Sequence, residues 1–145
     1  MKFKSITMEN FMRYKGVNTI EFSCDPGKNV TVVLGDNTVG KTTIAQAFRF
    51  GLYGAVNMEK WKNADDYQLL NNDVLAFMDA DSKAAVSVTI VAADEEKQYT
   101  ICRKTIYSRN YPQMTCREFQ KKVSMKIADL QAPDVVTEVD ERQVE

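Results

Sequence analysis

The sequence predicts one α/β domain built around a strand, a glycine-rich loop and a helix. The chain has 145 residues, of which 44% are hydrophobic and 27% charged, and this is typical of a single globular domain. Residues 30–34, VTVVL, are nearly apolar throughout, which indicates a strand covered on both faces. Residues 35–42, GDNTVGKT, match the phosphate-loop pattern G-x-x-x-x-G-K-[ST], and a helix-like pattern follows them.

Two strands are predicted before this loop. Residues 2–10 and 17–23 read as strands, and Tyr14-Lys15-Gly16 supplies the turn between them. Asp25-Pro26-Gly27 is a second turn, placed just before the apolar run at 30–34.

The helix after the loop is predicted over residues 41–53. Ile44, Phe48 and Leu52 recur every four residues, and Gly54 is a natural C-terminal stop. Short helices are possible at residues 65–70 and 73–78.

The second half of the chain predicts an antiparallel hairpin. Residues 86–92 alternate apolar and small polar side chains, residues 94–97 form a polar turn, and the chain returns as a strand over 99–107. Residues 122–130 alternate again and predict a further strand.

The loop residues have the chemistry of a phosphate site. Four residues between two glycines let successive backbone N–H groups surround a phosphate, and the following helix adds the positive end of its dipole. Lys41 can reach the β- and γ-phosphates of ATP, the Thr42 hydroxyl can bind Mg²⁺, and Thr43 can contact the α-phosphate. The candidate cofactor-binding residues are Gly35, Asp36, Asn37, Thr38, Val39, Gly40, Lys41, Thr42 and Thr43.

Composition excludes several other functions. The sequence has no histidine and three cysteines without a close pair, so histidine-based acid–base catalysis is excluded and neither a usual zinc site nor a disulfide framework is expected. We expect no membrane partner and a cytoplasmic location. Residues 99–126 carry seven basic residues and one acidic residue. This stretch favours solvated strand edges guarded by charge, and a nucleic-acid face is the alternative.

The N-terminal half resembles the corresponding lobe of the SMC-like ATPases, the ABC-type ATPases of chromosome maintenance and DNA repair. The resemblance rests on Asn10-Phe11, the strand at 20–22, the loop at 35–41 and Leu52-Tyr53-Gly54. The segment YQLLNNDVLAF and the hairpin after it are most similar to the DndD branch, which is linked to bacterial DNA phosphorothioation.

The resemblance implies a P-loop NTPase fold, with a mixed β-sheet around the loop helix. Residues 1–145 would form a single N-terminal nucleotide-binding lobe. It would bind ATP and Mg²⁺, and a C-terminal lobe of the same protein would complete it. ATP-dependent homodimerisation and a role on DNA are implied too. The family often has arginine directly after Asn-Phe, where this chain has Met12, so Arg13 is only a candidate phosphate contact. Thr38-Val39 also replaces small residues and could strain the loop.

The sequence is also compatible with two other functions. Residues 89–96, TIVAADEE, resemble a Walker B strand, so a self-contained P-loop kinase could use Asp94 and Glu95. We favour a hairpin turn there, because Ser87 and Thr89 make the strand two-faced. An interaction module with a vestigial loop is the third possibility. The sequence offers no catalytic residue for the attacking water, so we expect residues 1–145 alone to bind ATP and barely hydrolyse it.

Overall fold

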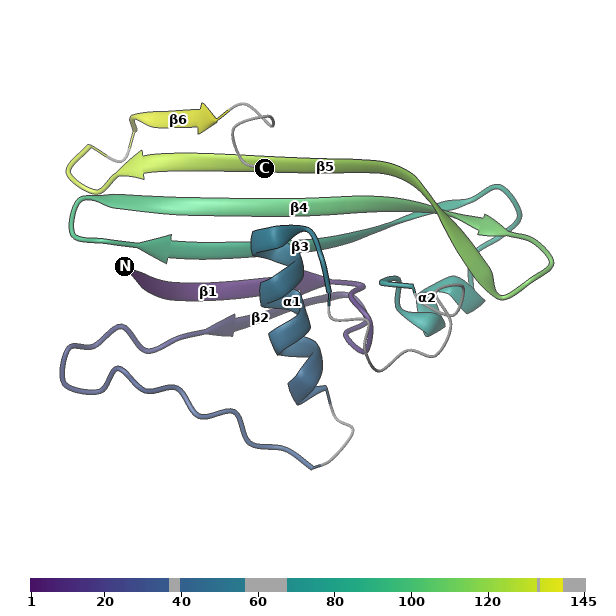
Figure 1. The fold of residues 1–145 in the computed structure, drawn as a ribbon, viewed down its shortest axis with the longest axis horizontal. Coiled ribbons are helices and arrows are strands. Elements are labelled where there is room, and N and C mark those ends of the chain that lie inside the picture. Colours follow the sequence, from purple (N-terminus) through teal and green to yellow (C-terminus); the bar gives the residue numbers. More distant parts are fainter. Residues whose placement is uncertain (37–39, 57–67, 133, 140–145) are drawn as a thin grey trace.

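The computed structural model is a twisted sheet with one long helix across a face (Figure 1). It describes residues 1–36, 40–56, 68–132 and 134–139. Within these residues the sheet order is β2-β1-β3-β4-β5-β6, and all neighbouring strands are antiparallel. The strands are β1 (Lys2–Glu9), β2 (Val17–Glu21), β3 (Lys83–Ala93), β4 (Lys97–Asn110), β5 (Thr115–Asp129) and β6 (Val136–Val139), and the helices are α1 (Lys41–Tyr53) and α2 (Asn72–Ala76).

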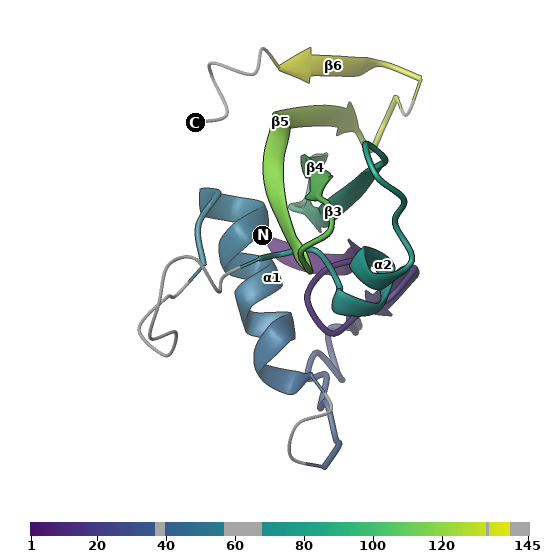
Figure 2. The ribbon, with the colours of Figure 1, turned by 90° about the vertical axis from the view of Figure 1, so that its right-hand side faces the viewer.

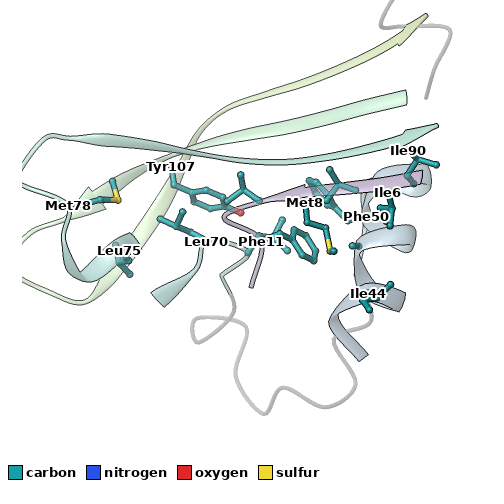
Figure 3. Close-up of a cluster of buried hydrophobic side chains, with 14 residues drawn as sticks. Ile6, Met8, Phe11, Ile44, Phe50, Leu70, Leu75, Met78, Ile90 and Tyr107 are labelled. Atoms are coloured by element: carbon teal, nitrogen blue, oxygen red, sulfur yellow. The ribbon is translucent and has the colours of Figure 1, made fainter. Parts of the chain in front are cut away.

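The core forms where α1 crosses β1 and β3. Alternate side chains of these strands point toward the helix, so Ile6 stands opposite Ile90 and Met8 opposite Val88. The same cluster extends to α2 at the far end of the sheet (Figure 3). Its buried members are Ile6, Met8, Phe11, Ile44, Ala47, Phe50, Leu69, Leu70, Leu75, Met78, Val86, Val88, Ile90 and Tyr107.

Helix α1 lies close to β3 because Gly51 faces the strand. A Cβ atom at Gly51 would lie 2.5 Å from Cδ1 of Ile90 and 3.1 Å from Cγ1 of Val88. The C-terminal end of α1 is held by β4, where Arg103 Nε donates to the Gly51 carbonyl at 3.1 Å and Nη2 to that of Leu52 at 3.4 Å. A cation here satisfies carbonyls that the helix leaves unpaired and complements the helix dipole.

Most of the predicted elements are confirmed. Helix α1 has the predicted bounds, and Gly54 ends it in the left-handed conformation, with φ 69°. The hairpin is confirmed as β3–β4, and the helix predicted at 73–78 appears as α2. The helix predicted at 65–70 lies mostly outside the described residues. Among the described helices, none combines the length and the hydropathy needed to cross a membrane.

The prediction of a buried strand at residues 30–34 is wrong. This segment is irregular, and Val30, Val32 and Leu34 are 76%, 71% and 87% exposed. The expected mixed sheet is therefore antiparallel throughout the described residues. The physical reason is that an apolar run indicates a segment that is buried by other residues, but it does not say which residues bury it. The described sheet ends at β2 and does not extend to residues 30–34.

Helix α1 covers one face of the sheet (Figure 2), and the second face is polar. Thr7 and Thr19 hydroxyls are 2.9 Å apart across β1 and β2, and Ser87 Oγ donates to Glu9 Oε2 at 2.9 Å. On β4 and β5, Lys104 stands directly opposite Lys122. Like charges in this position repel each other.

Candidate phosphate-binding site

The glycine-rich loop ends at Gly40, where helix α1 begins. Gly40 has φ 108° and ψ 10°, a conformation that residues with a side chain rarely adopt. Its carbonyl accepts from the Ile44 N–H at 3.2 Å, which starts the helix. Within the described part of the chain, no side chain caps this end of α1. The N–H groups of the first turn and the helix dipole therefore favour an anion here.

Lys41 adds a positive charge at the same place. Its Nζ donates to the carbonyl of Gly35 and, at 2.7 Å, to the carbonyl of Asp36. The lysine thus bridges the beginning of the loop and the start of the helix. A phosphate bound beside the helix would offer the ammonium group charged oxygens in place of neutral carbonyls, and such charge-assisted bonds are stronger.

The two threonines after Lys41 differ in exposure. Thr42 is exposed at the helix start, so its hydroxyl is open to a metal ion, whereas Thr43 is only 6% exposed. Metal binding by Thr42 and the Thr43 phosphate contact stay predictions. Asn37, Thr38 and Val39 lie outside the described residues.

Tyr14, which the sequence predicts only as part of a turn, contacts the loop. Its hydroxyl donates to the Gly40 carbonyl at 3.4 Å, and burial raises its pKa. Spacing alone could not have marked this residue, because its contact partner is a backbone atom far along the chain. Arg13 is exposed in the same turn, while Met12, with φ 50°, packs against the core. The structure thus brings the turn that carries Arg13 beside the loop.

A family model described as an AAA domain matches residues 5–142. The chain belongs to this family. Membership makes it an ATP-binding P-loop ATPase of the SMC-like type. No curated protein sequence matched the chain.

The acidic residues predicted as a possible Walker B pair, Asp94 and Glu95, lie in the turn between β3 and β4 of this AAA domain. Asp94 occupies the β3–β4 turn, where its Oδ1 accepts from the N–H groups of Glu96 and Lys97 at 3.0 and 2.8 Å. Its Oδ2 accepts from the Tyr99 hydroxyl at 3.0 Å. The Lys97 and Glu96 N–H groups, followed by Tyr99, hold the pKa of Asp94 below its usual range. Because β3 and β4 are antiparallel, the structure argues against the self-contained kinase with Asp94 and Glu95.

Proposed function

We propose that this AAA domain is the nucleotide-binding lobe of a longer SMC-like ATPase that acts in DNA modification, repair or defence, closest to the DndD ATPases. The observation that carries ATP binding is Lys41, held between the loop carbonyls and the uncapped start of α1. Members of this family use ATP and typically Mg²⁺. In this chain the Thr42 hydroxyl is the candidate Mg²⁺ ligand, and the bound ion would neutralise phosphate charge.

The test of nucleotide binding is the melting temperature with and without Mg·ATP. A ligand that binds only the folded state stabilises it by about 2.7 kcal/mol at a hundredfold excess over Kd, and this raises the melting temperature by several degrees. Lys41→Ala should lose most of that shift. Arg49→Ala, which removes an exposed cation from the same helix, is the matched control and should keep it. An equal shift in both variants would contradict binding at this loop.

A partner lobe is the second part of the proposal. The exposed side chains of Val30, Val32 and Leu34 support it, because an exposed apolar segment of this kind is usually buried against another domain or subunit. We propose that a C-terminal lobe of the same protein covers this run. It would also supply the residues that activate water, and a second copy would complete the site.

Turnover measurements test this second part. Phosphate release by residues 1–145 should barely exceed that of the Lys41→Ala variant. Full-length protein should hydrolyse ATP at a rate per molecule that rises with protein concentration, because two copies must meet. Robust turnover by residues 1–145, dependent on Lys41, would overturn the proposal that a C-terminal lobe and a second copy are needed for hydrolysis.

The polar sheet face supports a role on DNA. Lys104 and Lys122 stand opposite each other there, and a phosphate backbone would relieve their repulsion. Replacing both with glutamine should weaken duplex DNA binding and lower the salt slope by about 0.9 for each lost phosphate contact. Lys121→Gln changes the next residue, whose side chain points to the opposite face and pairs with Glu118 at 2.7 Å, and should leave the slope unchanged. Equal effects of the two changes would contradict a DNA site on this face.

A further inference from the structure

We propose that Tyr14 is a positioning residue for the phosphate loop, whose ring holds Gly40 in the conformation that binds phosphate. The inference rests on the proposed binding of ATP at this loop. It assigns a role to a turn that contributes no residue to the phosphate-loop motif.

The contact between Tyr14 and Gly40 is mainly one of packing. A Cβ atom at Gly40 would lie 3.3 Å from Cε2 and from the hydroxyl of Tyr14, and 3.4 Å from Cζ. The hydroxyl-to-carbonyl distance of 3.4 Å is long for an O–H···O hydrogen bond, so that bond is weak. The ring therefore supplies most of the restraint, because it fills the space directly beside the glycine.

The turn that carries Tyr14 is itself fixed to the core. Tyr14 N–H donates to the Phe11 carbonyl at 2.9 Å, and Phe11 is fully buried, with its ring centroid 5.6 Å from that of Phe50 on α1. Both backbone polar groups of Met12 form hydrogen bonds: its N–H donates to the Leu69 carbonyl at 2.6 Å, and its carbonyl accepts from Asn71 Nδ2 at 2.7 Å.

Asn71 joins this turn to α2. The residue is 6% exposed, its backbone N–H donates to the Asn10 carbonyl at 2.9 Å, and its Oδ1 caps α2 by accepting from the N–H groups of Asp73 and Val74. These hydrogen bonds fix the turn that carries Tyr14, and the Tyr14 ring packs against Gly40, since glycine is the residue with the greatest conformational freedom.

A fixed Gly40 lowers the cost of binding. Glycine loses more conformational freedom on ordering than any other residue, and a loop that is ordered before the ligand arrives binds more tightly. Removal of the ring should therefore weaken the affinity for any ligand that uses the loop N–H groups, whether or not that ligand carries a nucleobase.

The experiment is a titration of Mg·ATP and of inorganic triphosphate, which has no base, into wild-type protein and variants. Tyr14→Phe keeps the ring and should bind both ligands within about twofold of wild type. Tyr14→Ala should bind both about tenfold more weakly. If the alanine variant does not fold, Tyr14→Leu replaces it in the test, because leucine is too short to reach Gly40 and should weaken binding to the same extent. Tyr53→Ala, which removes a 76% exposed tyrosine at the other end of α1, is the control and should bind normally.

Each other outcome overturns a definite statement. If the wild-type protein binds both ligands and neither Tyr14→Ala nor Tyr14→Leu loses affinity for either ligand, this inference alone is overturned. If the variants lose affinity for Mg·ATP but not for triphosphate, Tyr14 contacts the nucleoside instead. A Tyr14→Phe variant as weak as Tyr14→Ala overturns the role of the ring. Wild-type protein that binds neither ligand overturns the proposed function, and this inference with it.

Discussion

Gly51→Ala should destabilise the protein, although alanine is the better helix former. Gly51 lies within α1, where replacement of glycine with alanine normally gains about 1 kcal/mol. Here the added methyl group would lie 2.5 Å from Cδ1 of Ile90 and 3.1 Å from Cγ1 of Val88. These two strand residues are 1% and 0% exposed, so neither side chain has free space to move into.

The steric term should exceed the gain in helix propensity. Overpacking a well-packed core costs about 1–3 kcal/mol, so the net loss in the free energy of unfolding should be about 0–2 kcal/mol after the helix gain is subtracted. Ile90→Val removes the Cδ1 atom that the new methyl group meets, and alone it should cost about 0.5–1.5 kcal/mol. The double variant should cost about 1 kcal/mol less than the sum of the two single variants, because the closest contact has gone.

Urea unfolding monitored by circular dichroism measures all these quantities. Gly27→Ala is the control, since a Cβ there would meet only Asp25 Oδ1 at 3.5 Å, and its effect should be within about 0.5 kcal/mol. A Gly51→Ala variant that is more stable than wild type would refute the close approach of helix and strand. Strict additivity with Ile90→Val would refute the assignment of the clash to Cδ1.

Three further predictions concern the remaining supports of the fold. Two backbone N–H groups lower the pKa of Asp94, so its contribution to stability is present above about pH 4 and lost as the pH falls through the lowered value; urea midpoints of Asp94→Asn and wild type should therefore converge as the pH falls below that value. Arg103→Leu should cost about 1–2 kcal/mol in the same assay, because two carbonyls of α1 lose a charged donor, and an unchanged midpoint would contradict the contact. Leu34→Ser should change the stability of residues 1–145 by less than about 0.5 kcal/mol, since Leu34 is 87% exposed, whereas Leu70→Ala should cost about 2–5 kcal/mol; similar losses would show that residue 34 is buried.

Local patterns were sufficient to predict the helix and the hairpin. Ile44 and Phe48 set the helical period of α1, and Gly54 marks its end. Ser87 and Thr89 alternate with buried valines and an isoleucine in β3, so the two-faced strand and its turn were readable. Strand β5 was predicted too short, because its first half, between Thr115 and Lys122, is mostly exposed on both faces and shows no alternation.

Two features of the site were beyond sequence reasoning for different reasons. The run at residues 30–34 has the composition of a covered strand, and composition cannot say where the cover comes from. Tyr14 became part of the site through tertiary contacts, because the Asn71 side chain and the Leu69 carbonyl fix its turn beside Gly40. Neither contact leaves a periodic pattern in the sequence.

The pairing of β1 with β3 has a consequence for how the chain folds. Ile6 pairs with Ile90, about 80 residues further along the chain, and α1 lies in the stretch between them. During synthesis the apolar face of the loop helix must therefore wait for β3 to emerge before it can be buried. Contacts between such distant segments slow folding, so chains truncated before residue 83 should expose this helix to chaperones, and chains that include β3 and β4 should not.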